Sequence, residues 1–312
     1  MPVSDRPGWV PDQAITPELV VPVIAAQFPD LAGLPVAPFA QGWDNAVLAV
    51  GEHWLLRVIH RTVALPGARR ELAVLNEIGP QLALPVPRPM RVGRPTAELP
   101  WPFWIAERLP GEELAALGPG LPRTEAASQM GAFLRGLHGP RHAATGVRLG
   151  LAVDPIGRGD PRTQAVRAGV RIAALRSAGR LPADPGVDAV LAGAAELTGP
   201  SAEPVLVHGD LHLRHVLVLT GEDGRCTVGG VIDWGDTSLA PPAVDLMIAF
   251  AAFDGDARAG FFDAYGPVSA RTALHARVVA LAVSAALAQG AVATAQEELA
   301  AAALVAIGRS AR

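Results

Sequence analysis

Short apolar runs separated by turn residues dominate residues 39–109 of the chain. Residues 46–50 and 53–59 are two such runs, and the Gly-Glu pair between them is typical of a hairpin turn. Apolar positions at helical spacing in residues 68–78 predict one helix, and a further apolar run covers residues 102–109. The pattern therefore predicts a small, sheet-rich first domain.

After Pro110-Gly111 the pattern changes, because most apolar residues now recur at helical spacing. This spacing predicts helices over residues 124–138, 166–178, 187–197 and from residue 243 onward. Shorter apolar runs predict strands at residues 204–207, 216–219 and 227–232. We therefore expect a small first domain over residues 1–109 and a larger, mostly helical domain over residues 110–312, in a fold of the α+β class.

A polar loop, residues 208–215, lies between two of the predicted strands and contains three His, one Asp and one Arg. Such residues are costly to place beside a core unless they face a cleft and pair with one another. Asp233 follows the next apolar run, so we expect it near Asp210. One carboxylate would then act as a base or orient a nucleophile, and the other would bind a metal ion.

The composition narrows the chemistry, because all 26 basic residues among the 312 are Arg and none is Lys. A Walker-type phosphate loop and a lysine Schiff base are therefore excluded, and any cation set against a phosphate must be Arg or a metal ion. The single cysteine, Cys226, excludes an internal disulfide framework. A net charge of −4 argues against a nucleic-acid-binding surface.

Membrane and targeting signals are weak. The first 23 residues are interrupted by prolines and contain no apolar core of a signal peptide. Residues 278–295 are mostly Ala, which favours a buried helix over a membrane span. We expect a cytoplasmic protein that is a monomer or weak homodimer, without a membrane or nucleic-acid partner.

Several short motifs together resemble the aminoglycoside/macrolide phosphotransferase family, which are small-molecule kinases with a protein-kinase-like fold. The motifs that carry this resemblance are His208-Gly209-Asp210-Leu211-His212, Ile232-Asp233-Trp234, Pro242-Ala243-Val244-Asp245-Leu246, Trp43-Asp44-Asn45, Arg57 and Arg70-Glu71. The resemblance implies two lobes, with a small antiparallel sheet in the N-terminal lobe and a larger, mostly helical C-terminal lobe. It also implies ATP or GTP as co-substrate, Mg²⁺ as cofactor and a small hydroxylated acceptor.

The same resemblance assigns the groups of the C-terminal lobe. Asp210 matches the catalytic aspartate that accepts or orients the proton of the acceptor hydroxyl. Asp233 matches the aspartate that binds Mg²⁺ at the nucleotide phosphates. His215 stands where an Asn usually supplies a second metal ligand, and imidazole suits Mg²⁺ less well than an oxygen donor. His208 and Asp245 are expected to brace the loop.

In the N-terminal lobe the resemblance implies a nucleotide site. Arg57 takes the place of the usual strand lysine and would hold phosphate oxygens, with Glu71 as its ion-pair partner. Gly42 and Asn45 would belong to the turn over the phosphates, although no G-x-G-x-x-G pattern is present there. The backbone from Glu107 to Leu109 would face the base of the nucleotide.

Two other functions fit parts of the pattern. His208, His212 and His215, with Asp210, are candidate ligands of a metal-dependent hydrolase, although Gly209 argues against a helix that would align them. A catalytically silent nucleotide-binding protein is the other alternative. For a kinase, residues 154–200 carry six Arg against five acidic residues, which favours a macrolide acceptor over a polycationic aminoglycoside. The family resemblance implies a role in antibiotic resistance.

Overall fold

The computed structural model describes residues 12–42, 44–118, 121 and 123–312. The chain divides into two compact units. The first unit takes the residues up to Pro80 and Pro87–Leu109, and the second takes Gln81–Val86 and Pro110–Arg312. The short segment Gln81–Val86 therefore belongs to the second unit, although the chain around it belongs to the first. Its Pro85 carbonyl accepts a hydrogen bond from the backbone N–H of Val231, 2.9 Å away.

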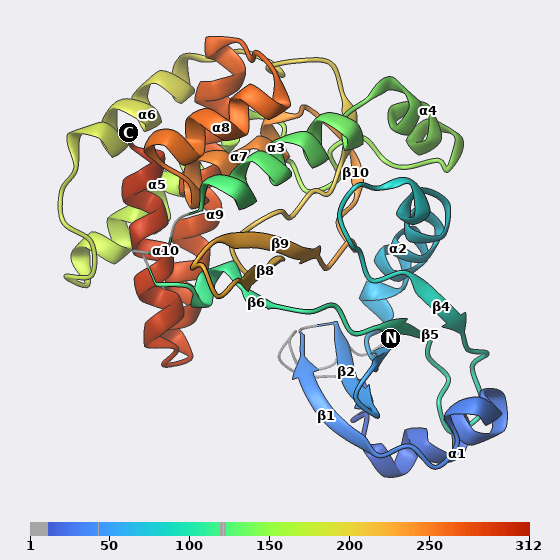
Figure 1. Ribbon diagram of the computed structural model, residues 1–312. Coiled ribbons are helices and arrows are strands. Elements are labelled where there is room, and N and C mark those ends of the chain that lie inside the picture. The colour runs from blue at the N-terminus through green and yellow to red at the C-terminus, as the bar shows by residue number, and fades with distance from the viewer. Residues whose placement is uncertain (1–11, 43, 119–120, 122) are drawn as a thin grey trace, which may run out of the picture. The chain divides into compact units, whose positions relative to one another are not determined.

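The first unit is built on a five-stranded antiparallel sheet with the strand order β1-β2-β3-β5-β4 (Figure 1). Alternate residues of β2 are buried, as expected for a strand with one face on a core. Its apolar face packs with the first helix and with Phe103 and Ile105. The strands are β1 (Val36–Gln41), β2 (Asn45–Val50), β3 (Trp54–Ile59), β4 (Pro89–Val92) and β5 (Phe103–Glu107).

Two helices accompany this sheet, α1 (Pro17–Gln27) and α2 (Leu65–Ile78). The apolar pattern did not predict α1, because three prolines lie in or near it; Pro17 sits in its first turn, where a missing N–H costs nothing. The predicted start of the second helix was also wrong. It begins at Leu65 rather than Ala68, because Pro66 lies within its first turn instead of preceding it.

The second unit contains eight described helices (Figure 1). The predicted break at Gly139-Pro140 ends one helix but also starts another, because Pro140 occupies the first turn of α4. The fifth helix likewise begins at Pro161, with Asp160 as its N-cap, and not at Val166. The helices are α3 (Thr124–Leu137), α4 (Pro140–Arg148), α5 (Pro161–Ser177), α6 (Pro185–Glu196), α7 (Ala243–Ala252), α8 (Gly255–Tyr265), α9 (Ala270–Ala293) and α10 (Glu297–Ser310).

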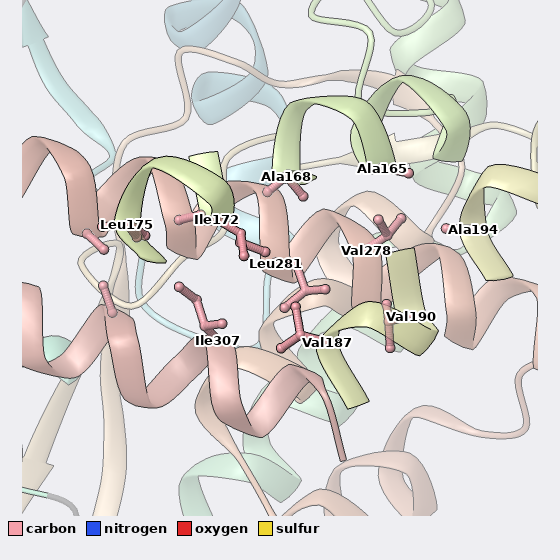
Figure 2. Close-up of a cluster of buried hydrophobic side chains, with 14 residues drawn as sticks. Ala165, Ala168, Ile172, Leu175, Val187, Val190, Ala194, Val278, Leu281 and Ile307 are labelled. Atoms are coloured by element: carbon pink, nitrogen blue, oxygen red, sulfur yellow. The ribbon is translucent and has the colours of Figure 1, made fainter. Parts of the chain in front are cut away.

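A hydrophobic core joins α5, α6, α9 and α10 (Figure 2). Ile172 and Leu175 of α5 point toward Leu281 of α9 and Ile307 of α10, and many of the other members are Ala, which lets the helices approach closely. The helix α9 is long and apolar enough to cross a membrane, but 61% of its most apolar window is buried inside the protein. This burial is typical of a core helix, and α5 packs against α9 in this core.

Two small sheets carry the loops of chemical interest in the second unit. One is the antiparallel pair β10 (Ser238–Ala240) and β7 (Val205–Val207). The other has the order β6-β8-β9, formed by β6 (Glu112–Glu113), β8 (Val216–Thr220) and β9 (Cys226–Val231). The loop of residues 208–215 leaves β7 in the first sheet and enters β8 in the second. It therefore connects two sheets rather than two neighbouring strands.

Candidate active site

The loop of residues 208–215 is held by one buried carboxylate. Asp245, in the first turn of α7, accepts hydrogen bonds from the backbone N–H groups of His208 (2.7 Å) and Gly209 (3.0 Å). His138 Nε2 lies 3.3 Å from the same carboxylate, and the other nitrogen of His138 lies 2.9 Å from the Tyr265 hydroxyl. Asp245 therefore braces the loop, as the sequence suggested, rather than facing a substrate.

Gly209 is required by both conformation and space. Its φ is +89°, in the region that L side chains rarely adopt. A Cβ at this position would also lie 2.2 Å from the backbone carbonyl oxygen of Asp236. The loop and the segment after Asp233 thus approach each other backbone to backbone, which only glycine permits.

Asp210 follows directly and is surrounded by cationic and imidazole groups. Its Oδ1 lies 2.7 Å from Arg158 Nη2, and its Oδ2 lies 3.7 Å from both His212 Nε2 and His215 Nδ1. Burial raises the pKa of the Asp210 carboxyl, whereas His212, the Arg158 guanidinium and His215 lower it, and the net direction is downward. Asp210 is therefore a carboxylate at neutral pH.

His215 lies between the two carboxylates that the sequence predicted to be neighbours. Its Nδ1 lies 2.8 Å from the backbone carbonyl oxygen of Asp210, so this nitrogen carries the proton and donates it. Its Nε2 lies 3.6 Å from Asp233 Oδ2. With the proton on Nδ1, the Nε2 of His215 carries a lone pair that faces the carboxylate oxygen of Asp233. A lone pair and a carboxylate oxygen can together bind a cation. Asp233 Oδ2 and His215 Nε2 are thus two neighbouring atoms that could bind a cation, and their role as metal ligands stays a prediction.

Asp233 has an unusual backbone, with a φ of +65° in the left-handed region. Non-glycine residues pay a conformational cost there, and such residues concentrate at functional sites. Its side chain is 42% exposed, whereas the following Trp234 is fully buried and donates its indole N–H to the Val231 carbonyl at 2.9 Å. The buried Trp234 anchors the turn that presents Asp233 to solvent.

His212 is a neutral imidazole in this arrangement. Its Nδ1 accepts a hydrogen bond from the backbone N–H of Arg214 at 3.2 Å, so the proton lies on Nε2, the nitrogen that faces Asp210. Burial and the neighbouring His215 lower the pKa of His212 to about 3. The rings of His212 and His215 stack with their centroids 3.8 Å apart. His212 thus offers an N–H donor rather than a charge beside Asp210.

The three imidazoles of the alternative hydrolase site do not come together as one set of metal ligands. His208 is fully buried, with Nε2 2.9 Å from the Ile232 carbonyl oxygen and Nδ1 accepting from the Asp210 N–H at 3.3 Å. Both of its nitrogens are engaged with backbone, so it cannot bind a metal ion as well. Ligand atoms of Asp210, His212 and His215 do lie within 4.8 Å of one another. However, the hydrogen bonds above place protons on the nitrogens that face Asp210.

The first unit contains the predicted ion pair. Arg57 Nη1 on β3 lies 2.8 Å from Glu71 Oε1 on α2, and the Glu71 side chain is only 1% exposed. The Arg57 guanidinium also lies 5.5 Å from the centre of the Trp104 ring, on the neighbouring strand β5. A buried carboxylate and an aromatic face therefore fix a guanidinium that is itself 17% exposed.

The other predicted nucleotide-binding residues lie on the same unit. The N–H of Gly42 donates to the Asn45 carbonyl at 2.9 Å, which closes the turn between β1 and β2; Trp43, between them, lies outside the described residues. Glu107 is exposed at the end of β5, and Leu109 is partly buried just beyond it.

One functional candidate could not be found in the motifs, namely Arg158. It lies in the turn before α5, far from residues 208–215 in sequence, and its guanidinium reaches both Asp210 and the Gly209 carbonyl oxygen. The only sequence signal was the excess of Arg over acidic residues in residues 154–200. That count did not indicate which Arg reaches the loop.

The model of the phosphotransferase enzyme family (APH) matches residues 35–277 of the chain. No curated protein sequence matches. Among solved structures, the chain is similar to the GDP and kanamycin complex of APH(2")-IIia, with 16% identity, a TM-score of 0.64 and coverage of 93% of this chain and 97% of that one.

Two further solved structures are similar. Macrolide 2'-phosphotransferase MphH from Brachybacterium faecium has 23% identity and a TM-score of 0.57, with 93% and 97% of the two chains covered. Spectinomycin phosphotransferase APH(9)-Ia, in complex with ADP and spectinomycin, has 14% identity and a TM-score of 0.60, with 95% and 94% covered. At these identities the likeness shows the fold, and it confirms the predicted fold class. Because the family model spans most of the sequence, the chain belongs to the phosphotransferase enzyme family.

Proposed function

We propose that this phosphotransferase moves the γ-phosphate of ATP or GTP to a hydroxyl group of a small molecule. The observation that carries the proposal is the position of His215, whose imidazole lies 3.7 Å from the carboxylate of Asp210 and 3.6 Å from that of Asp233. The Asp210 carboxylate can orient an acceptor hydroxyl. The Asp233 carboxylate, together with Nε2 of His215, can bind a cation.

In this proposal Asp210 is the catalytic residue. The acceptor hydroxyl donates its hydrogen bond to the Asp210 carboxylate, which orients the oxygen and receives its proton as the reaction proceeds. The acceptor oxygen forms a bond to the γ-phosphorus, the bond from phosphorus to the bridging oxygen breaks, and a nucleoside diphosphate leaves. The lowered pKa of Asp210 keeps the group ionised and ready to accept.

Asp233 and His215 would hold Mg²⁺. When bound, the ion would supply positive charge that offsets the charge of the nucleotide phosphates. The chain supplies the ligands on a rigid support, because Trp234 is buried beside Asp233 and the His215 ring is fixed by the Asp210 carbonyl. A carboxylate oxygen is the donor that Mg²⁺ prefers, so Asp233 would contribute more to binding than His215.

Arg57 is the group of the first unit that would contact the nucleotide phosphates. Its pair with the buried Glu71 directs it, and its planar fork can bind two phosphate oxygens at once. Gly42 and Asn45 would lie over the phosphates, and the backbone of Glu107 to Leu109 would contact the base. APH(2")-IIia was solved with GDP and APH(9)-Ia with ADP, which supports a nucleotide co-substrate without favouring ATP or GTP.

Charge and surface character favour a macrolide-like acceptor over an aminoglycoside. A guanidinium that is always charged, Arg158, lies beside Asp210, and a polycationic acceptor would be repelled there. On α5, which begins three residues later, Val166 and Val170 are each 68% exposed and offer an apolar surface. We therefore propose a bulky, largely apolar acceptor and a role in antibiotic resistance, in the cytoplasm where nucleotide is available.

A screen of purified protein tests the proposal. ATP and GTP would each be supplied with Mg²⁺ and with erythromycin, kanamycin, spectinomycin or a simple amino alcohol. We expect nucleoside diphosphate to form only when an acceptor is present, fastest with the macrolide. Rapid turnover of kanamycin alone would reverse the acceptor ranking. Nucleotide binding without turnover of any hydroxylated compound would support a silent nucleotide-binding protein instead.

A further inference from the structure

Arg158 contacts the 208–215 loop through both terminal nitrogens of its guanidinium. Nη2 lies 2.7 Å from Asp210 Oδ1, and Nη1 donates to the carbonyl oxygen of Gly209. The two side chains of the pair are only 18% and 22% exposed. The guanidinium therefore holds Asp210 and its neighbour Gly209 by two partly buried contacts, which differ from an exposed surface ion pair.

The turn of residues 154–160 is built to hold Arg158 in place. Asp154 accepts hydrogen bonds from the N–H groups of Arg158 (2.8 Å) and Gly159 (2.9 Å), and has a φ of +44°. The side-chain amide of the buried Gln164 donates to the Gly157 carbonyl at 2.6 Å. A non-glycine residue in the left-handed region persists only where its surroundings fix it. These bonds supply that support.

A second support comes from α9. His275 is fully buried, and its Nε2 lies 3.0 Å from the Arg158 carbonyl oxygen, so this nitrogen donates. Its Nδ1 then accepts from the Ser201 hydroxyl at 2.8 Å. Burial lowers the pKa of His275, which keeps the ring neutral and this tautomer in place. Arg158 is thus connected to the helical core and not only to its own turn.

The contact with Arg158 gives the two carboxylate oxygens of Asp210 different surroundings. Oδ1 is occupied by the guanidinium. Among the residues that the structure describes, the partners of Oδ2 are the imidazoles of His212 and His215 at 3.7 Å, beyond hydrogen-bonding distance. The groups that act on the carboxylate are Arg158 from the turn, His212 and His215 from the loop, and His208 beneath it. Oδ2 is therefore the oxygen that can receive a hydroxyl proton.

We propose that Arg158 is a positioning residue that holds Oδ1 of Asp210 and so presents Oδ2 to the acceptor hydroxyl. The proposal rests on the function proposed above, since it needs Asp210 to orient the acceptor. It adds a residue from the segment before α5 to the machinery of the 208–215 loop. Arg158 acts on the acceptor through Asp210 and does not take part in nucleotide binding.

The test compares Arg158→Met and Arg158→Lys with the matched control Arg162→Met. Arg162 lies four residues away and is exposed. Its guanidinium donates to the Ala195 carbonyl, and its backbone N–H donates to the N-cap Asp160, a bond that Arg162→Met keeps. The single variant Asp210→Asn and the double variant Arg158→Met/Asp210→Asn would be made as well. The urea midpoint of each variant would be measured, and kcat and KM would be determined with MgATP and erythromycin.

We expect Arg158→Met to lower the urea midpoint of the wild type more than that of Asp210→Asn, because the charged partner of the guanidinium is absent from Asp210→Asn. We expect kcat to fall roughly tenfold or more, with the KM for ATP within about twofold of wild type. Arg158→Lys keeps the charge but not both contacts of the guanidinium, so it should recover part of kcat. Arg162→Met should match wild type.

Additive losses of the urea midpoint in the double variant Arg158→Met/Asp210→Asn would overturn the proposal, as would a loss of kcat no larger than that in Arg162→Met. Urea unfolding of each variant shows whether it is folded, and Arg158→Lys decides the question if Arg158→Met is not. If wild-type protein turns over no acceptor, the proposed function fails, and the proposed role of Oδ2 fails with it. The urea midpoints would still decide separately whether Arg158 holds Asp210.

Discussion

The chemistry of this protein concentrates on a few side chains whose protonation is set by their contacts. His212 is held as a neutral donor by the Arg214 backbone, and His215 is held with its proton toward the Asp210 carbonyl. The two rings therefore differ in role although they stack on each other. The His212 ring points its N–H toward the Asp210 carboxylate, and the His215 ring points a nitrogen lone pair toward Asp233.

Asp210→Asn tests the role of the catalytic carboxylate. The variant keeps the shape of the side chain but cannot accept a proton, whereas Asp233 and His215 remain. We expect kcat to fall by about 10²–10⁴-fold with nucleotide affinity nearly unchanged. Kinetics of the variant together with a nucleotide titration measure the two effects. A fall in nucleotide affinity as large as the fall in kcat would contradict this role.

Glu71→Gln tests the nucleotide side. The substitution removes the charge that fixes Arg57 at 2.8 Å, so the KM for ATP or GTP should rise about tenfold with a smaller change in kcat. Asp30→Asn is the matched control, since Asp30 also pairs with an Arg of the same unit, at 2.6 Å, but its side chain is 57% exposed. We expect the control to behave as wild type. Equal effects of the two substitutions would remove Arg57 from the nucleotide site.

The residues of the site were predictable to different degrees. Asp210, His215 and Asp233 lie in short motifs, and the hairpin of β8 and β9 brings them together, so local sequence was enough. Arg57 and Glu71 followed from a strand next to a helix. Arg158 was not predictable, because its contact depends on how α5 packs on α9 and on a turn held by Asp154.

At the scale of elements, the position of the loop depends on the start of α7. Asp245 lies in the first turn of α7, where a carboxylate is stabilised by the helix dipole, and it accepts two backbone N–H groups from the loop. His138, at the end of α3, contacts the same carboxylate. Three separate elements therefore meet at one buried group.

Asp245→Asn replaces one of the two accepting oxygens with an NH₂ group. That group would face a backbone N–H of the loop, so two donors would meet without an acceptor. In a buried network this should lower the free energy of unfolding by about 2–4 kcal/mol and reduce kcat, because the loop loses its anchor. Urea unfolding and kinetics measure the two effects. The control Asp188→Asn breaks a pair of 2.9 Å on an exposed side chain and should cost about 1 kcal/mol or less. Similar losses in both variants would contradict the bracing role.

Element boundaries show where sequence patterns are insufficient. Apolar spacing located α3 and the strands β2, β3 and β9 closely. The apolar pattern missed α1 and α4 because proline was placed outside every predicted helix. In the structure, proline occupies the first turn of both helices. The pattern also missed β10, a three-residue strand whose partner β7 lies far away in sequence.

At the scale of the whole molecule, two buried histidines and the largely buried His212 make stability depend on pH. Burial lowers the pKa of His208, His212 and His275, that of His212 to about 3. These groups stay neutral in the folded protein, whereas in the unfolded chain they take up protons near pH 6.5. The unfolded state therefore binds more protons below pH 6.5, and stability falls as the pH falls through that region.

We expect the free energy of unfolding to be nearly constant from pH 8 to pH 7. Below about pH 6.5 it should then fall by up to about 4 kcal/mol per pH unit, at about 1.4 kcal/mol for each proton taken up. Urea unfolding at pH 7.5, 6.0 and 5.0 measures this slope. His212→Gln should reduce the slope by about one proton. A free energy of unfolding that stays constant down to pH 5 would show that these rings are protonated in the folded protein.

The most direct test of the central claim is the fate of a labelled γ-phosphate. Wild-type protein would be incubated with Mg²⁺, γ-labelled ATP or GTP and an acceptor from the screen, and the label followed by mass and by chromatography. The account predicts one labelled acceptor molecule for each nucleoside diphosphate formed, and loss of the transfer in Asp233→Asn. Cleavage of the acceptor without nucleotide, by protein that carries stoichiometric zinc, would contradict it.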